Sequence, residues 1–323
     1  KSKKVIIYKN LTLETFGVPV AFIPYFYHPD PSVKRKTGLL QPRFSSSSTF
    51  GTTYKQSLYI ASSPNSDITI TPKITTKEGV ILDGQYRNLS KSGETLFSGS
   101  VTYGTKIREN EPDKKVPRGH IDLRTAHKLN ENWIVGTDFS RSSDRTYLSR
   151  YGFGRGGNVL SQNLFLERYT LGKDLKINVY KFQRLSSEID PLNVPSIRPN
   201  INYKWTNLYS AKNRFLTSTI DINFLERKDN TSTNRIASSL LAEIPYILKS
   251  GYLIDNSLEI KFDAYKAKLD GNNTGTYNNL RFSPLGSMKI KYPLIKKLKR
   301  DTSKIEPVFQ FIISPSNTDK NTI

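Results

Sequence analysis

The sequence predicts an all-β fold, and three observations carry that prediction. Apolar and polar residues alternate with a period of two in many segments, as they do in strands with two different faces. No segment keeps a helical period over three turns, and no stretch of 18 or more apolar residues is present. Strands that are apolar on one face occur both in membrane-spanning barrels and in soluble sandwiches, so alternation alone leaves both architectures open.

The first elements surround a proline-rich stretch. Residues 3–17 are expected to form two short strands, and residues 17–42 follow with five prolines in an otherwise apolar run. Proline lacks a backbone N–H and is excluded from helix interiors and central strands. We therefore expect residues 17–42 to be neither a transmembrane helix nor an ordinary core strand.

A long meander of about fifteen strand-like segments contributes the rest of the chain. In one of them Leu258, Ile260, Phe262 and Ala264 alternate with polar residues or tyrosine. Many of these segments exceed the usual length of globular strands, and aromatic residues gather toward their ends. These features favour an outer-membrane barrel over a soluble protein.

The connections between these segments are of two kinds. Tight turns are predicted at residues 88–94 and 127–133, and longer loops at residues 106–119, 186–196, 226–233 and 268–278. Short turns at one end and long loops at the other are typical of outer-membrane barrels.

The charge of the chain indicates an anionic partner. Lys and Arg total 49 against 28 Asp and Glu, a net charge of +21. The candidates are nucleic acid, phospholipid headgroups and lipopolysaccharide (LPS). The basic residues are spread over nearly every segment, which suits a charged lumen and rim better than a nucleic-acid groove. We therefore expect no nucleic-acid partner.

Enzymatic chemistry is not expected. The chain has no Cys, which excludes disulfides and thiolate sites, and only three His. His120 and His127 are seven residues apart, which places them on opposite faces of a strand, and His28 is expected in a loop. The glycine-rich residues 151–158 precede a strand-like segment, so they are expected to form a loop rather than a phosphate site. No cofactor or metal is predicted.

Several motifs resemble one family, the LPS-assembly outer-membrane proteins (LptD). They are Gly17-Val18-Pro19-Val20, Pro24-Tyr25, Lys34-Arg35-Lys36 and Thr37-Gly38-Leu39-Leu40-Gln41-Pro42, followed by likenesses over residues 51–88 and 132–151 and by a proline-bearing loop at residues 187–203. The motifs cover roughly the first two-thirds of the chain and keep the family's order.

The resemblance implies a periplasmic β-jelly-roll followed by a large antiparallel transmembrane β-barrel. Residues 1–28 would end the jelly-roll, residues 29–42 would be a proline-rich junction, and residues 43–323 would be a partial barrel. The implied function is non-enzymatic LPS transport and assembly at the outer leaflet of a Gram-negative outer membrane, with lateral exit through a barrel seam. The implied partners are LPS, outer-membrane lipids, a plug lipoprotein of the LptE type and a periplasmic bridge protein of the LptA type.

Site residues follow from the same resemblance. The lipid path or lateral gate would contain Pro19, Phe22, Pro24, Tyr25, Phe26, Pro29, Pro31 and Pro42. Lys34, Arg35 and Lys36 would contact phosphate groups or the membrane rim, because basic side chains pair well with phosphate. A rigid connector with a basic interfacial anchor is an equal alternative for this stretch.

Two departures from the family pattern bear on the interpretation. No cysteine is available to lock two domains together, and the polar C-terminal residues do not form a closing strand that ends on an aromatic residue. The sequence is therefore expected to be a piece of a longer protein. A porin-like channel and a soluble basic all-β binding protein stay open as alternative functions.

Overall fold

A computed structural model describes most of the chain. The described residues are 4–33, 35–106, 114–153, 157–186, 194–209, 214–227, 230–269, 274–297 and 301–315, and for Pro29, Leu208 and Tyr209 only the backbone is described. Lys34, a predicted phosphate contact, lies outside them.

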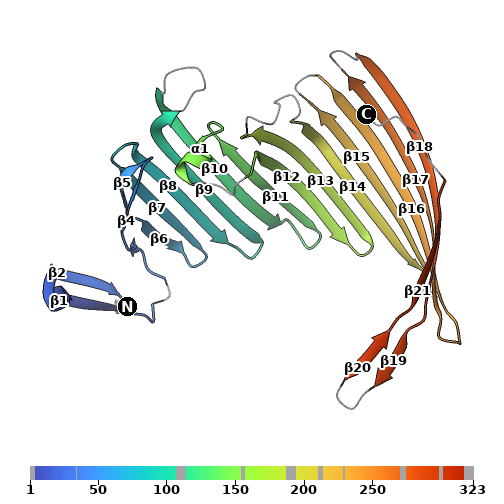
Figure 1. Cartoon of the computed structure of the whole chain (residues 1–323), viewed down its shortest axis with the longest axis horizontal. Coiled ribbons are helices and arrows are strands. Elements are labelled where there is room, and N and C mark those ends of the chain that lie inside the picture. The colour runs from blue at the N-terminus through green and yellow to red at the C-terminus, as the bar shows by residue number, and fades with distance from the viewer. Residues whose placement is uncertain are drawn as a thin grey trace. The chain divides into compact units, whose positions relative to one another are not determined.

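Antiparallel strands make up nearly all of the described structure (Figure 1). The strands are β1 (Val5–Thr15), β2 (Val18–Pro29), β3 (Gly38–Leu39), β4 (Arg43–Ser47), β5 (Gly51–Lys55), β6 (Leu58–Ser63), β7 (Ser66–Thr75), β8 (Gly79–Leu89), β9 (Gly93–Lys106), β10 (Lys114–Lys128), β11 (Trp133–Ser142), β12 (Val159–Thr170), β13 (Lys173–Arg184), β14 (Ser196–Tyr209), β15 (Arg214–Glu226), β16 (Ser232–Ile247), β17 (Leu253–Leu269), β18 (Gly275–Lys291), β19 (Leu294–Lys297), β20 (Thr302–Ile305) and β21 (Val308–Ile313). One five-residue helix, α1 (Tyr147–Tyr151), lies between β11 and β12. The predicted all-β fold is confirmed.

The chain divides into two compact units, residues 1–121 and 122–323, with the division inside β10. Within the described residues, no helix is both long enough and apolar enough to cross a bilayer.

The first unit begins with a two-stranded ribbon, the β1–β2 hairpin. Residues 3–17 were expected to form two strands, but β1 is one strand of 11 residues. His28 was expected in a loop, and this expectation is wrong because His28 pairs with Ile6 inside β2. The apolar run of residues 18–29 pairs with a single partner strand, so it needs only one continuous ladder.

Two of the three prolines of β2 lie where this ladder is irregular. Pro19 pairs with Glu14 beside a register shift. Pro24 lies between Ile23 and Tyr25, which pair with Leu11 and Lys9 of β1. Asn10 lies between these two partners and has a left-handed backbone with φ of 54°. A missing N–H costs least at such positions. The ribbon therefore accommodates the prolines without giving up its pairing.

The next strands of the first unit are interrupted. β7 pairs with β6 through one half and with β5 through the other, so β5 and β6 together form one broken strand. β4 pairs with β5 and β3 with β6, with Pro42 just before β4. At the break the Gln56 side chain donates to the Leu40 carbonyl at 2.6 Å. A side-chain amide thus replaces a ladder bond where the backbone is interrupted.

The second unit contains a continuous antiparallel meander. Strands β11 to β18 pair in chain order, and β21 pairs with the far edge of β18. Between β18 and β21 the chain extends into the short β19–β20 hairpin (Figure 1).

The register of this meander gives the sheet two different faces. One row of directly paired residues is apolar throughout: Val135, Leu166, Ile177, Ile201, Ile222, Ile236, Ala264 and Leu280. The neighbouring residues on the other face form a mostly polar row: Glu167, Lys176, Asn202, Asp221, Ala237, Asp263 and Arg281. We call these the apolar face and the polar face. The predicted alternation from Leu258 to Ala264 is confirmed.

The connections of the second unit lie alternately at the two ends of the sheet, because successive antiparallel strands turn at opposite ends. Those at residues 129–132, 171–172, 210–213 and 248–252 are short. At the other end, the connections at residues 143–158 and 185–195 are much longer, while those at residues 227–231 and 270–274 are about as short as the first group. We call these two ends the short-turn end and the long-connection end. Of the glycine-rich residues 151–158, which were expected to form a loop, Tyr151 ends α1, residues 152, 153, 157 and 158 lie between α1 and β12, and residues 154–156 lie outside the described residues.

Candidate functional site

The β1–β2 hairpin carries most of the predicted lipid-path residues. Pro19, Phe22, Pro24, Tyr25, Phe26 and Pro29 all lie on β2. The Tyr8 and Phe26 rings lie 6.0 Å apart, and Tyr8 also shares a 3.2 Å hydrogen bond with His28. A two-stranded ribbon has no second layer, so Phe22 is 62% exposed and Tyr25 54% exposed. The hairpin therefore presents an apolar surface that a further protein layer or a lipid would cover.

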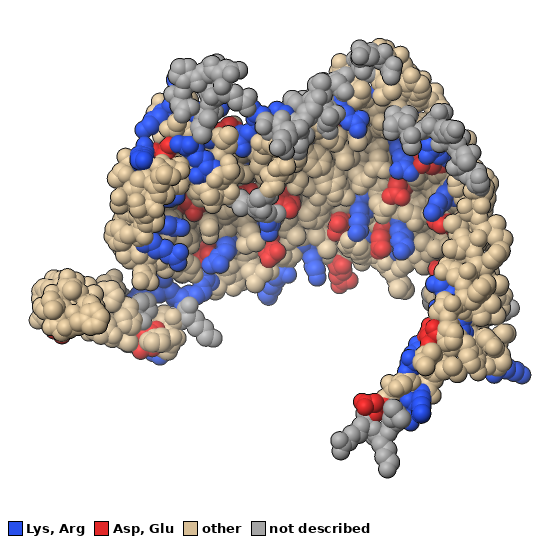
Figure 2. Space-filling view, in the orientation of Figure 1, with Lys and Arg blue, Asp and Glu red and all other residues tan. Residues whose placement is uncertain are grey.

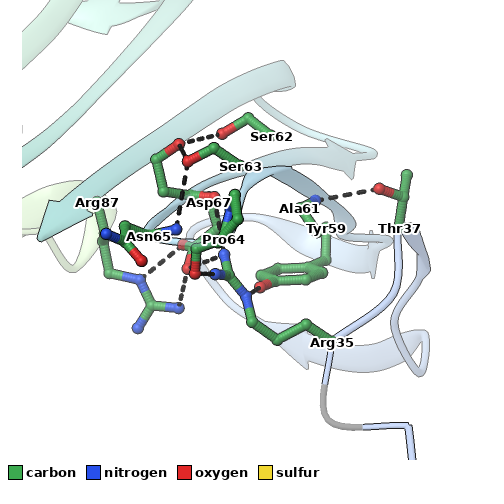
Figure 3. Close-up of polar contacts among 11 residues, drawn as sticks. Arg35, Thr37, Tyr59, Ala61, Ser62, Ser63, Pro64, Asn65, Asp67 and Arg87 are labelled. Atoms are coloured by element: carbon green, nitrogen blue, oxygen red, sulfur yellow. Dashed lines mark hydrogen bonds and ion pairs between the residues drawn. The ribbon is translucent and has the colours of Figure 1, made fainter.

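The segment after the hairpin is anchored by Arg35, as Figure 3 shows. Its guanidinium donates to the Tyr59 hydroxyl at 3.0 Å, to the Ser66 carbonyl at 2.7 Å, and to the Pro64 carbonyl. It also pairs with Asp67 at 3.3 Å. We call these contacts the Arg35 clamp. They fasten the chain that leaves β2 to the β6–β7 turn.

Asp67 is the shared acceptor of the Arg35 clamp. Arg87 donates to it through Nε at 2.8 Å and through Nη2 at 3.2 Å (Figure 3). Beside it, the Ser66 hydroxyl contacts those of Ser62 and Ser63, each at 2.7 Å. One carboxylate thus pairs with two guanidinium groups, and the serine hydrogen bonds lie in the turn that presents it.

The remaining described residues of the prediction, Pro31, Lys36 and Pro42, lie on the chain between β2 and β4. Lys36 places its ammonium group 5.6 Å from the centre of the Tyr27 ring on β2, a cation–π distance. Pro31 lies in the turn after β2, where the backbone N–H of Ser32 donates to Asp30 at 2.8 Å. Hydrogen bonds from Ser32 lower the pKa of the exposed Asp30 carboxyl. Phosphate contact by Lys34, Arg35 and Lys36 stays a prediction, and Arg35 already has protein partners.

The polar face of the second unit carries ion pairs. Arg235 forms a bidentate pair with Asp263, at 2.8 and 2.6 Å. The two residues line a hollow of about 390 Å³ together with Asp221, Lys261 and Arg281. Figure 2 shows basic and acidic side chains interspersed on the surface turned to the viewer. Charges of both signs on one face and an apolar opposite face fit a wall between water and hydrocarbon, and they also fit one layer of a soluble sandwich.

The described His, Asp and Glu side chains can also be compared with the arrangement that a metal site requires. Among the described side chains, no group of His, Cys, Asp and Glu is arranged to hold a metal ion. His120, a candidate in the sequence, is buried in a 2.7 Å hydrogen bond with Ser100.

Sequence reasoning missed the Arg35 clamp. These contacts join Arg35 to the turn between β6 and β7, which lies about 30 residues later in the chain. The signal that could have revealed it is the pair Asp67 and Arg87, which face each other once the two strands are aligned. The basic pair beside the proline run instead suggested phosphate contact.

Comparison with known proteins gives consistent matches. The model of the family LptD, LPS transport system D, matches residues 117–323. The LPS-assembly protein LptD of Pseudomonas aeruginosa (strain LESB58) is 34% identical over 139 residues, which cover 43% of this chain and 15% of that protein. The LPS-assembly protein LptD of Actinobacillus pleuropneumoniae serotype 5b is 30% identical over 202 residues, which cover 60% of this chain and 25% of that protein.

A third relative agrees with these two. The LPS-assembly protein LptD of Pasteurella multocida (strain Pm70) is 31% identical over 178 residues, or 54% of this chain and 22% of that protein. In these three relatives the matched region spans a quarter or less of the relative's length. Because the family model covers more than half of the chain, the protein belongs to the LptD family of LPS transport proteins.

Proposed function

We propose that the protein transports LPS and assembles it at the outer leaflet of a Gram-negative outer membrane, without catalysing a reaction. The single observation that carries this proposal is the family match over residues 117–323. The two faces of the second unit support it, because a wall with one apolar and one polar face is what a membrane-spanning strand meander requires.

The proposed architecture extends the described strands. The meander from residue 43 onward would form part of a closed transmembrane barrel, and residues 1–28 would be the last strands of a periplasmic jelly-roll. The exposed apolar side chains of the β1–β2 hairpin support this, since they need a covering layer. Residues 29–42 would be the junction, with the Arg35 clamp as its fixed point.

The proposed lipid path follows the proline-rich junction. LPS would pass Pro19, Phe22, Pro24, Tyr25, Phe26, Pro29, Pro31 and Pro42 and leave sideways through a seam beside the first barrel strands. Breaks in the ladder support this, because strands interrupted at β3/β4 and β5/β6 have fewer bonds to open. The polar face would meet a plug lipoprotein of the LptE type, and the jelly-roll would receive LPS from a bridge protein of the LptA type.

Depletion of the full-length protein in its own organism tests the function. Newly made LPS, pulse-labelled and counted at the cell surface, is expected to fall with the protein and return on complementation. A control outer-membrane barrel is expected to stay at its normal level. If surface LPS stays normal while uptake of small solutes falls, the porin-like alternative replaces the proposal.

A further inference from the structure

A second hollow, of about 680 Å³, lies at the long-connection end of strands β11 to β15. The charged residues among those that line it are Arg141, Arg145, Lys181, Arg184, Arg198, Arg227 and Glu226. We call it the basic hollow. Six cationic side chains against one carboxylate leave a positive excess, even though Arg145 and Arg184 have interactions of their own.

Strand register places much of this lining on the apolar face. Thr137, Leu164 and Val179 form one row of paired residues, and Phe139, Gln162 and Lys181 form the next such row on the same face. Lys181 therefore lies two residues beyond Val179, about 7 Å further along the strand.

The neighbouring strands repeat this placement. Ser196 pairs with Glu226, which continues the apolar-face series of Ile222 and Phe224. Arg198 follows Ser196 by two residues, at the register shift that the β14–β15 pairing has between Ile197 and Asn200. The register thus places Gln162, Lys181 and Ser196 on the face that carries the apolar rows, and Phe182 and Arg184 on the other face, so the basic hollow lies at the rim where the two faces meet.

The frame of the basic hollow is held by hydrogen bonds. The side-chain amide of Gln183 accepts from the Ser142 backbone at 2.9 Å and donates to its carbonyl at 2.7 Å. The Leu185 backbone N–H donates to the Asn158 carbonyl at 2.8 Å. The Gln183 bonds connect the ends of β11 and β13 across β12, and the Leu185 bond connects the end of β13 to the start of β12, so hydrogen bonds brace the rim that carries these cations.

We propose that the basic hollow binds the phosphate groups of a phosphorylated lipid headgroup that lies in the leaflet beside the wall. Arg and Lys are the side chains best suited to phosphate, and the hollow is of ligand size. Its position favours a lipid over a free anion, because acyl chains can lie along Leu164 and Val179 while the headgroup reaches Lys181. The inference rests on the proposed function in placing the apolar face against lipid.

The test uses the purified full-length protein in detergent, with bisphosphorylated lipid A as the probe. The variant Lys181→Gln/Arg198→Gln removes two cations of the basic hollow. The matched control is Lys173→Gln/Arg168→Gln, which removes one Lys and one Arg from the same face at the short-turn end, on β13 and β12. Bound lipid A is counted by native mass spectrometry, and folding is checked by heat-dependent gel mobility.

The hollow variant is expected to hold one lipid A molecule about tenfold to a hundredfold more weakly, while lipid A on the proposed proline-rich path stays bound, because removing one charge-assisted hydrogen bond to phosphate weakens binding about tenfold. The control is expected to stay within about twofold of the parent. Equal binding by the hollow variant, an equal loss in the control, or full binding of lipid A stripped of phosphate would each overturn the proposal. Inorganic phosphate that binds as tightly as lipid A would show a free-anion site instead.

Two additions keep the test decisive. If the Gln variant does not fold, Lys181→Arg/Arg198→Lys keeps the charges and is expected to bind within about threefold of the parent. Binding to the unaltered protein is also expected to weaken steeply with added salt, and binding that ignores salt contradicts the proposal. Surface LPS after depletion is a separate measurement, so failure of this site and failure of the proposed function are told apart.

Discussion

Leu240 on β16 offers a sharp test of the two-faced wall. Its partners Ser218 and Ile260 lie in rows of the apolar face, and it is 43% exposed. The preceding residue, Ser239, faces the other way, opposite Thr219 and Lys261. The two positions therefore report on the two faces of one strand at the same depth.

The expected magnitudes follow from that geometry. Leu240→Arg places a guanidinium against hydrocarbon near the middle of the strand, which costs about 2–4 kcal/mol. This equals about a 30-fold to several-hundred-fold change in the folding equilibrium. Ser239→Arg adds a cation to the polar face, where repulsion from Lys261 costs less than about 1 kcal/mol.

The assay is urea unfolding of the full-length protein inserted into bilayers, followed by gel mobility. The difference in free energy of unfolding between Leu240→Arg and Ser239→Arg is the quantity of interest. Equal values for the two variants, or a larger cost at Ser239, would refute the assignment of the apolar face to lipid.

Three further predictions concern packing and the Arg35 clamp. Asp67→Asn removes the charge shared by Arg35 and Arg87. We expect the free energy of unfolding to fall by about 1–2 kcal/mol and protease cleavage near residues 30–36 to become faster. Asp174→Asn is the control and is expected to change neither. Gly136→Ala would place a methyl group against the Thr125 carbonyl and the Phe165 ring, so urea unfolding should show a loss of about 1–3 kcal/mol; Gly286, with open space around it, should tolerate Ala, and equal effects would contradict this packing. Gln56→Ala leaves the Leu40 carbonyl without its side-chain donor; hydrogen exchange should accelerate in β3 and β6 but not in β8, and unchanged exchange would show that the ladder break needs no bridge.

The strands of the meander could be predicted from sequence because each carries its own pattern. Alternation from Leu258 to Ala264 is visible in the chain alone, and β17 places those residues as expected. The two tight turns were found for a similar reason, since short polar segments between alternating runs leave little choice of structure. Local signals of this kind do not depend on what the strand pairs with.

Features that depend on pairing could not be predicted in the same way. Pro24 argues against a paired strand, yet β2 accommodates it because Asn10 takes up the irregularity. Arg35 is held by groups about 30 residues away, which no local pattern encodes. The basic hollow gathers residues from 141 to 230, and only the folded structure shows that they share one end of the wall.

Photo-crosslinking at Phe26 tests the central claim most directly. A photoreactive residue replaces Phe26 in the full-length protein in cells, and Leu171, fully exposed in the turn between β12 and β13, is the control position. The account predicts an LPS-bearing adduct at Phe26 that requires active LPS export, and none at Leu171. Absence of the adduct at Phe26, or equal adducts at both positions, would contradict an LPS path along the proline-rich hairpin.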